Sequence, residues 1–483
     1  MVAGDRSHSG RWLRRSSATF VVLVLVLAGV SYQFDLGRQW LGWGPPSPVT
    51  EPSEVAPPSG LTLPSPSAAP EVAVETSDEQ AAPRKVRRAL AGLVSDQDLG
   101  RSVAVAVAQV HDGRSVYRTG ASLVTPASTL KLLTAAAVLE SLGPDHRFRT
   151  TVSLGPGGPT SGRVVLVGGG DPFLERAQAT DDDLYPPRAD LETLADATAE
   201  ALRERGRTAV RVGYDTSLFS GPATSPDWEP SYVPEDVVTP VSALWTNEGR
   251  TRSGRVNSDP AAEAAEDFAQ ALAKKQIVVL GEPRPVQAAD AAEELAAVES
   301  APLERIVEHV LKVSDNEAAE VLFRHVAVAA GKPGSFADAS RVVRKVLGRL
   351  GVDMSRARIL DGSGLARKNR LAPETLVSVI EVASGDEHPS LRPVVTGLPV
   401  AGFSGSLAYR FETGDKQGLG RVRAKTGTLT GVHGLAGVVT DLDGTELAFV
   451  AIADRVKVAD TLDAREVLDE VAAALAGCAC GTT

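Results

Sequence analysis

The chain has 483 residues and a formal net charge of −11, with 43% hydrophobic and 23% charged residues. This length allows two or three domains at roughly 150 residues each, and the ordinary composition excludes fibrous and wholly disordered chains. An acidic chain is a poor partner for nucleic acid, which rewards clustered positive charge, so we expect no nucleic-acid binding.

The N-terminus predicts a membrane-targeting segment. Residues 1–15 carry four arginines, and residues 16–34 carry no charge. A run of this length, at ~1.5 Å per helical residue, just spans a hydrocarbon core of ~30 Å. Basic residues remain in the cytoplasm, so we expect a cytoplasmic segment at 1–15, a transmembrane signal anchor at 16–34 and the rest of the chain outside the cytoplasm at the cell membrane. The alternative is a cleaved signal peptide and an exported protein.

Two further segments are unlike a folded core. Residues 35–84 are rich in proline and serine and predict an extended linker. The tail at 477–483 contains both cysteines of the chain, Cys478 and Cys480. Two cysteines are too few for a disulfide framework or a zinc site. They could form a local disulfide, chelate a metal weakly or have no function, and we favour the last interpretation.

The remaining sequence predicts an α+β fold with an insert. A β-hairpin pattern near 103–117 precedes a helix at 129–142, and three strand patterns between 422 and 453 precede a helix at 464–476. The first and last strands can share one sheet. From 151 to 289, short β runs alternate with helical stretches and predict an insertion domain. The catalytic domain would then comprise 85–150 and 290–476.

Three short motifs carry the predicted chemistry. They are Ser-Thr-Leu-Lys at 128–131, Ser-Asp-Asn at 314–316 and Lys-Thr-Gly-Thr at 425–428. On a helix, residues three apart share a face, so the amine of Lys131 lies beside the Ser128 hydroxyl, a weak nucleophile that needs a base. Lysine is a base when burial and a neighbouring cation, here Lys425, lower its pKa.

The other motif residues suit substrate binding and proton transfer. Ser314 can relay a proton to a leaving nitrogen, and the Asn316 amide can orient a peptide bond. The Lys425 cation and the hydroxyls beside it can bind a carboxylate, and Gly427 leaves room for a close backbone approach. Backbone N–H groups near Ser128 and Thr428 can form an oxyanion hole.

Each motif alone also has a structural explanation. Ser-x-x-Lys occurs by chance, Ser314–Glu317 fits a helix capping box, and Lys-Thr-Gly fits the end of a strand. All three in this order, on a helix start, between helices and on a strand, favour a catalytic function.

The motif set resembles the active-site serine penicillin-recognising enzymes. The long stretch between the first two motifs is similar to that of the D-alanyl-D-alanine carboxypeptidase/endopeptidase family, the class C low-molecular-mass penicillin-binding proteins. Local stretches at 167–172, 214–219, 240–244, 360–365 and 403–407 also look like that family. The resemblance implies an antiparallel sheet flanked by helices, with a large α/β insert between the first and second motifs.

The resemblance also implies roles for individual residues. The catalytic residues would be the acylated nucleophile Ser128, its base Lys131 and Ser314. Substrate-binding residues would be Asn316, Lys425, Thr426, Gly427 and Thr428. The substrate would be a peptidoglycan stem peptide ending in D-Ala-D-Ala, β-lactams would acylate the nucleophile, and no metal or organic cofactor is implied.

Several alternatives remain open at this point. A β-lactamase on the same catalytic platform, or a catalytically silent wall-binding scaffold, would share the motifs, and the preference for carboxypeptidase or endopeptidase activity is undetermined. Gly362–Gly364 is either a structural turn or a wall of the site. Arg367, Lys368 and Arg370 form either a solvated loop or a contact to peptidoglycan. His433 is predicted at a turn or strand end rather than in the chemistry.

Overall fold

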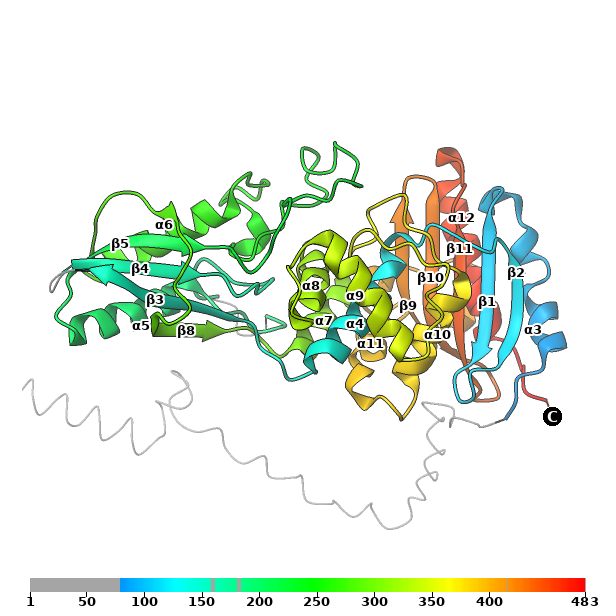
Figure 1. Ribbon diagram of the computed structural model, residues 1–483. Coiled ribbons are helices and arrows are strands. Elements are labelled where there is room, and N and C mark those ends of the chain that lie inside the picture. Colours follow the sequence, from blue (N-terminus) through cyan, green and yellow to red (C-terminus); the bar gives the residue numbers. More distant parts are fainter. Residues whose placement is uncertain (1–78, 158–160, 180–183, 415, 483) are drawn as a thin grey trace, which may run out of the picture. The chain divides into compact units, whose positions relative to one another are not determined.

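The computed structural model describes residues 79–157, 161–179, 184–414 and 416–482 (Figure 1). The predicted cytoplasmic segment 1–15, the anchor 16–34 and most of the linker 35–84 lie outside these residues. Within the described ranges, no helix combines the length and apolar character needed to span a membrane.

The first sheet joins the two ends of the predicted catalytic domain. It is antiparallel, with strand order β2-β1-β11-β10-β9. The predicted pairing of the first and last strands is confirmed, because β1 pairs with β11 from Val103↔Ala453 to Gln109↔Leu447. The strands are β1 (Val103–Gln109), β2 (Ser115–Gly120), β9 (Val422–Leu429), β10 (Val432–Thr440) and β11 (Glu446–Ala453).

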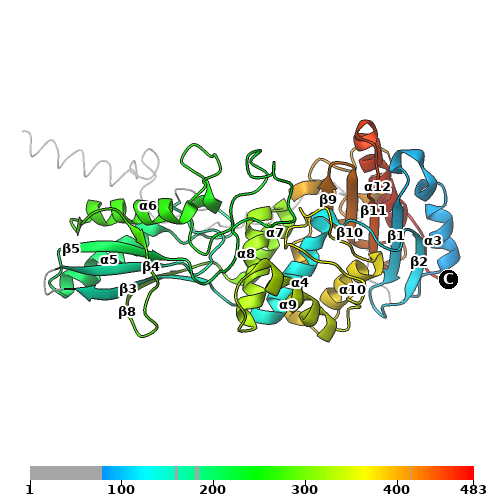
Figure 2. The ribbon, with the colours of Figure 1, turned by 45° about the horizontal axis from the view of Figure 1, so that its top comes forward.

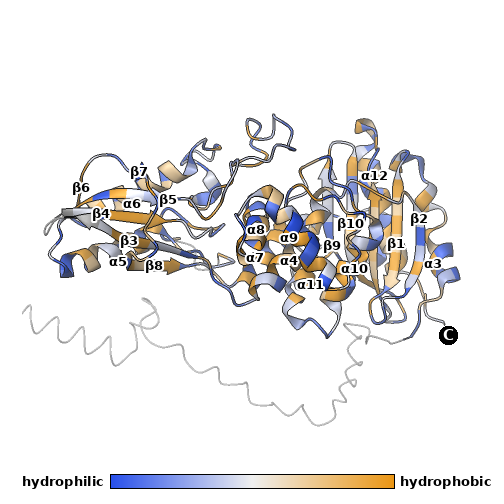
Figure 3. Cartoon of the chain, in the orientation of Figure 1, coloured by the Kyte–Doolittle hydropathy of each residue, from blue (hydrophilic) through white to orange (hydrophobic). Residues whose placement is uncertain are grey.

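Both faces of this sheet are covered. Along β11, Phe449 and Ala451 pack into one hydrophobic cluster with α3 (Pro83–Leu90) and α12 (Thr461–Ala476), whereas Val450 packs into the other cluster with α10 (Pro373–Ser384). This alternation is the two-residue period of a strand that is buried on both sides. Figures 1 and 2 show the helices on the two faces, and Figure 3 shows the apolar residues along β1, β10 and β11.

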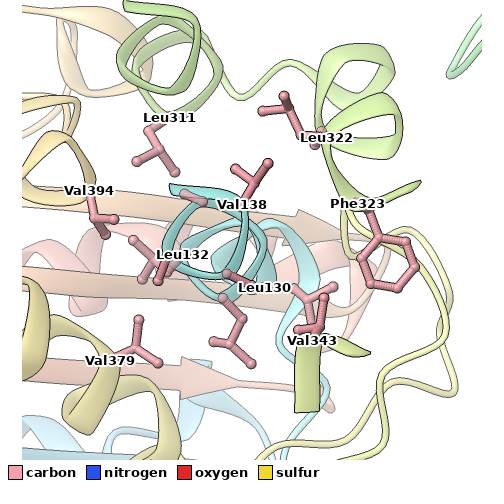
Figure 4. Close-up of a cluster of buried hydrophobic side chains, with 14 of the residues drawn as sticks. Leu130, Leu132, Val138, Leu311, Leu322, Phe323, Val343, Val379 and Val394 are labelled. Atoms are coloured by element: carbon pink, nitrogen blue, oxygen red, sulfur yellow. The ribbon is translucent and has the colours of Figure 1, made fainter. Parts of the chain in front are cut away.

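A helical layer surrounds α4 (Lys131–Leu142), whose residues from Lys131 to Leu139 are all buried. A helix that is apolar on every side belongs at the centre of a core. In Figure 4, Leu132 and Val138 of α4 lie among side chains from the neighbouring helices, including Phe323. The surrounding helices are α7 (Leu303–Val313), α8 (Asn316–Ala329), α9 (Phe336–Arg349), α10 and α11 (Pro393–Thr396).

The predicted insert forms a second sheet of order β6-β5-β4-β3-β8, in which β4, β5 and β6 are parallel. It includes two helices, α5 (Leu191–Glu204) and α6 (Pro260–Lys274). The C-terminal boundary of the insert differs from the predicted residue 289. Strand β8 pairs with β3 of this sheet, so the insert extends to Glu299. The strands are β3 (Arg149–Gly157), β4 (Ser161–Val167), β5 (Ala209–Asp215), β6 (Val278–Val279), β8 (Glu293–Glu299) and β7 (Arg284–Pro285), which pairs with β5.

The end of the predicted linker and the predicted tail both belong to the folded domain. Ala81 forms a β-bridge with Gly481, and Ala82 N donates to Cys480 O at 2.7 Å. Cys478 and Cys480 form a disulfide, and Cys480 is fully buried. Of the three interpretations of the cysteines, the local disulfide is therefore correct, and the favoured one is wrong. The disulfide lies where the two ends of the domain meet.

Candidate active site

The first motif places its serine and lysine in direct contact. Ser128 lies in a 3-10 turn (Ala127–Leu130) that leads directly into α4, so the regular helix begins two residues later than the predicted start at 129. Side chains three residues apart in a 3-10 turn are eclipsed. Lys131 Nζ is accordingly 3.1 Å from Ser128 Oγ, within hydrogen-bonding distance.

The amine of Lys131 is fixed by two further acceptors. It donates to Asn316 Oδ1 at 2.8 Å and to the Ser363 carbonyl at 2.9 Å. The side chain is fully buried. Burial lowers the pKa of Lys131 to about 8, and nearby carboxylates, with Glu320 first among them, oppose this shift. An amine with such a pKa is neutral in a useful fraction of molecules near neutral pH and can accept a proton.

Lys425 is also fully buried, and its Nζ donates to the Thr426 carbonyl at 3.1 Å. Burial, and then the charge of Lys131, lower the pKa of Lys425 well below its ordinary value. The sequence predicted that Lys425 would lower the pKa of Lys131. Burial is the largest cause of the shift at Lys131, and the repulsion between the two amines is mutual, so it disfavours the protonation of both.

The second motif contributes its asparagine directly. Asn316 begins α8, accepts from Lys131 and donates through Nδ2 to the Val237 carbonyl of the insert at 3.2 Å. Asp315, rather than Ser314, caps the helix by accepting from Ala318 N at 2.9 Å. Ser314 ends α7 in a left-handed conformation with φ 68°. Across the described residues, its hydroxyl makes no hydrogen bond to Ser128 or Lys131, so its predicted relay role stays a prediction.

The third motif lies on β9 beside the serine-bearing turn. The Thr426 hydroxyl is 2.8 Å from the Ser406 hydroxyl, and Thr428 is exposed. A Cβ at Gly427 would lie 2.9 Å from the Pro126 carbonyl and 3.4 Å from Ala127 Cβ. The absent side chain of Gly427 thus makes room for the segment that carries the nucleophile, and its predicted clearance for substrate stays a prediction.

A cleft of about 580 Å³ opens at this position. Ser128, Asn316 and Thr428 line it, whereas Lys131 and Lys425 lie behind its surface. The other lining residues come from the insert, from the loop after Gly364 and from the end of β9. These lining residues include Glu229, Ser231, Tyr232, Glu235, Val237, Leu365, Arg367 and Thr430.

The Gly-Ser-Gly segment at 362–364 forms an inner wall of the site beside Lys131, and the described residues of this loop that line the cleft begin at Leu365. The Ser363 carbonyl holds Lys131, and Gly364, with φ 90°, is so close to the Ala127 carbonyl that a Cβ there would lie 1.9 Å from its oxygen. Ala127 itself has φ 47°, a conformation that L-residues rarely adopt. Ala127 directly precedes Ser128, the predicted nucleophile, and backbone strain at such a position is expected to help position its side chain.

Sequence reasoning missed the buried polar residues that hold this wall. Glu320 accepts from the backbone N–H groups of Gly362 and Ser363, and Thr134 donates to the Gly362 carbonyl at 2.7 Å. Asp361 accepts hydrogen bonds within the same loop and from Trp228 Nε1. One signal was available for Glu320, because it lies four residues after Asn316 and therefore on the same helical face.

The basic cluster after this loop is used within the protein. Arg367 donates twice to the Thr430 carbonyl at 3.0 Å, Lys368 pairs with Asp227 at 3.2 Å, and Arg370 donates to Thr125 Oγ1 at 2.9 Å. Only Arg367 of the three lines the cleft, among the residues described. His433 is buried as the second residue of β10, as expected for a strand end.

Three carboxylates beside the second motif lie close together. Oxygens of Glu248, Asp315 and Glu317 are within 4.8 Å of one another. Burial and their mutual repulsion raise the pKa of Glu248 to about 9 and that of Glu317 to about 7, and Arg250 pairs with Glu317 at 2.8 Å. The three carboxylates and Arg250 thus form one charged network next to Asn316.

The sequence matches the family described as D-Ala-D-Ala carboxypeptidase 3 (S13) over residues 86–257 and 250–475. The chain belongs to this family. It is 36% identical over 417 residues to the carboxypeptidase DacB of Mycolicibacterium smegmatis, covering 85% of this chain and 88% of the relative. It is 30% identical over 438 residues to a D-alanyl-D-alanine carboxypeptidase of an Actinomadura species, covering 76% and 80% of the two chains.

The fold is also that of a solved structure. Penicillin-binding protein 4 of Haemophilus influenzae superposes with a TM-score of 0.66 at 23% identity, covering 78% of this chain and 97% of that one. The family, the α+β fold with its insert, and the enzyme class expected from the motifs, a serine D-Ala-D-Ala carboxypeptidase, are therefore confirmed.

Proposed function

We propose that Ser128 is the nucleophile of this D-Ala-D-Ala carboxypeptidase and that Lys131 is its base. The observation that carries the proposal is the 3.1 Å contact between Ser128 Oγ, at the cleft surface, and the buried Lys131 amine behind it. A neutral lysine within hydrogen-bonding distance can accept the hydroxyl proton as the oxygen attacks.

The reaction proceeds in two steps on a peptidoglycan stem peptide. Ser128 Oγ attacks the carbonyl carbon of the penultimate D-Ala, and its proton passes to Lys131. The C–N bond to the terminal D-Ala breaks, the leaving nitrogen takes up the proton, and an ester to Ser128 remains. Water then hydrolyses this ester. Ser314 is the proposed relay to the leaving nitrogen.

The third motif is suited to the substrate's terminal carboxylate. The exposed hydroxyl of Thr428 lies on the cleft, and the buried Lys425, three residues earlier on β9, supplies a cation when protonated. Charge-assisted hydrogen bonds of this kind are the stronger ones in proteins. Asn316, which is held by Lys131 and the insert, is placed to orient the scissile peptide bond.

Penicillin provides the direct test of the nucleophile. A β-lactam acylates the same serine, so intact-protein mass spectrometry should show one penicillin adduct on the wild-type chain. Ser128→Ala should abolish both the adduct and D-Ala release. Ser314→Ala should still form the adduct, more slowly, on the peptide that contains Ser128. An adduct on Ser128→Ala would contradict the assignment.

The same experiment separates the alternative functions. A β-lactamase would lose the adduct rapidly and turn over nitrocefin many times, whereas a carboxypeptidase retains the adduct and releases D-Ala from a stem pentapeptide. A silent scaffold would do neither. Release of D-Ala from a cross-linked peptide dimer would assign endopeptidase activity as well.

We further propose that the uncharged run at 16–34 anchors the enzyme in the membrane, with the catalytic domain outside the cytoplasm. The support is its length and the arginines that precede it. The full-length chain should sediment with membranes and resist extraction by salt, while a shortened chain of residues 79–483 should be soluble and still acylated. An N-terminus after residue 28 in the mature protein would show cleavage instead of anchoring.

A further inference from the structure

We propose that Glu320 is a positioning residue for the nucleophile and its base, acting through the backbone of the 362–364 wall. The inference rests on the proposed roles of Ser128 and Lys131 and adds to them. Glu320 lies one helical turn after Asn316 on α8, behind the wall and away from the cleft.

The contacts of Glu320 are directed at backbone groups. Oε2 accepts from Gly362 N at 2.9 Å, and Oε1 accepts from Ser363 N at 2.7 Å. Both carboxylate oxygens thus bind consecutive N–H groups of one loop. Such hydrogen bonds to a carboxylate are short and strong, and two of them fix the orientation of both peptide planes.

The loop transmits this orientation to both members of the catalytic pair. The Ser363 residue that donates to Glu320 also offers its carbonyl to Lys131 Nζ at 2.9 Å. The next residue, Gly364, packs against the Ala127 carbonyl, directly before Ser128. Movement of the loop would therefore displace the lysine amine and the serine backbone together.

Burial makes a carboxylate at this position costly. Glu320 is fully buried, and burial followed by the charge of Asp361 raises its pKa, while the hydrogen bonds that its two oxygens accept from Gly362 N and Ser363 N favour the ionised form. An apolar side chain would pack here without this cost. The two backbone hydrogen bonds account for the presence of an acidic group.

The charge of Glu320 also acts on the base. Among the carboxylates that raise the pKa of Lys131 against burial, Glu320 has the largest effect, ahead of Asp315 and Asp361. Asp361 also faces Glu320, and so does Arg324, one turn further along α8, whose pKa Glu320 raises against burial. Loss of the carboxylate should therefore lower the pKa of Lys131.

The matched test compares Glu320→Gln with Thr134→Val. Thr134 also holds the loop, through the Gly362 carbonyl, but carries no charge. We expect Glu320→Gln to reduce kcat for D-Ala release and the rate of penicillin acylation about 10- to 100-fold with little change in KM, because Glu320 does not touch the cleft. The acid limb of its pH profile should move to lower pH, whereas Thr134→Val should slow acylation without moving that limb.

Three outcomes would overturn the inference. They are wild-type acylation rates in Glu320→Gln, a rise in KM with kcat unchanged, and a pH profile identical to that of Thr134→Val. If Glu320→Gln does not fold, Glu320→Asp replaces it. This variant keeps the charge on a shorter side chain. Its acylation should therefore be slower than in the wild type, while the acid limb of its pH profile stays at the wild-type pH. A wild-type acylation rate would again overturn the inference. Failure of the wild-type chain to form the Ser128 adduct would refute the proposed function instead.

Discussion

Lys131 shows how opposing electrostatic effects set the properties of a single residue. Complete burial favours the neutral amine, while Glu320, Asp315, Asp361 and Glu317 favour the ammonium. Burial is the larger effect, and the pKa falls from 10.5 to about 8. The fall is large enough to make a base and small enough to leave the ammonium available as a donor to Asn316 and Ser363.

This balance predicts the pH dependence of acylation. Since only the neutral amine accepts the serine proton, the second-order rate constant for penicillin acylation should rise with pH and level off above about 8. In the folded protein Lys131 binds fewer protons than in the unfolded chain between about 8 and 10.5, so its contribution to the free energy of unfolding increases with pH across that window. Stopped-flow acylation between pH 5 and 10 checks the first statement. A flat profile would exclude Lys131 as the base.

At the scale of elements, two glycines from different elements allow close contact with the serine-bearing turn. Gly427 of β9 allows contact with Pro126 and Ala127, and Gly364 of the wall allows contact with the Ala127 carbonyl. A side chain at either position would push the turn away. The site therefore depends on the close approach of a strand, a loop and a 3-10 turn from distant parts of the sequence.

Gly364→Ala should be more damaging than Gly143→Ala, which is a matched control. Both glycines have a positive φ, 90° and 84°, but a Cβ at Gly143 would meet nothing within 4 Å. Gly143→Ala should cost about 1–3 kcal/mol from backbone strain alone and leave acylation intact. Gly364→Ala should lose more stability and most of its acylation, as measured by thermal unfolding and penicillin labelling. Equal effects of the two substitutions would contradict this packing.

At the scale of the whole molecule, the insert completes the catalytic site. The Val237 carbonyl accepts from Asn316, Trp228 donates to Asp361 of the wall, and Glu229, Ser231, Tyr232 and Glu235 line the cleft. Trp228 and Trp245 also belong to the same hydrophobic cluster as α4 and α8. Part of the insert therefore packs into the core of the catalytic helices, while its own sheet, α5 and α6 form a separate hydrophobic cluster.

Trp228→Phe and Trp245→Phe test this coupling with the same substitution. Trp228 Nε1 donates to Asp361 at 3.0 Å, and Trp245 Nε1 donates to the Asp171 carbonyl, within the insert, at 3.1 Å. Each change leaves a buried acceptor with one partner fewer and should cost about 1–3 kcal/mol by denaturant unfolding. Only Trp228→Phe should also slow acylation, because Asp361 holds the wall beside Lys131. Similar acylation rates in both variants would contradict the coupling.

The sequence by itself determined the family, the α+β class and the Ser128–Lys131 contact. This contact could be predicted because it is local: on a helix, two residues three positions apart lie on the same face, so their side chains meet. The periodicity of the strands and helices likewise depends on neighbouring residues, which explains why most elements were predicted correctly.

The tertiary structure alone decided what lies behind the catalytic pair. Glu320 and Thr134 act through backbone groups of a loop that is distant in sequence, and no local pattern records such pairings. The contacts of Gly427, the burial of Lys131 and the assignment of β8 to the insert also depend on which segments meet in space. Which residues are buried, and which distant segments meet, depends on the complete fold, so local sequence patterns do not reveal these contacts.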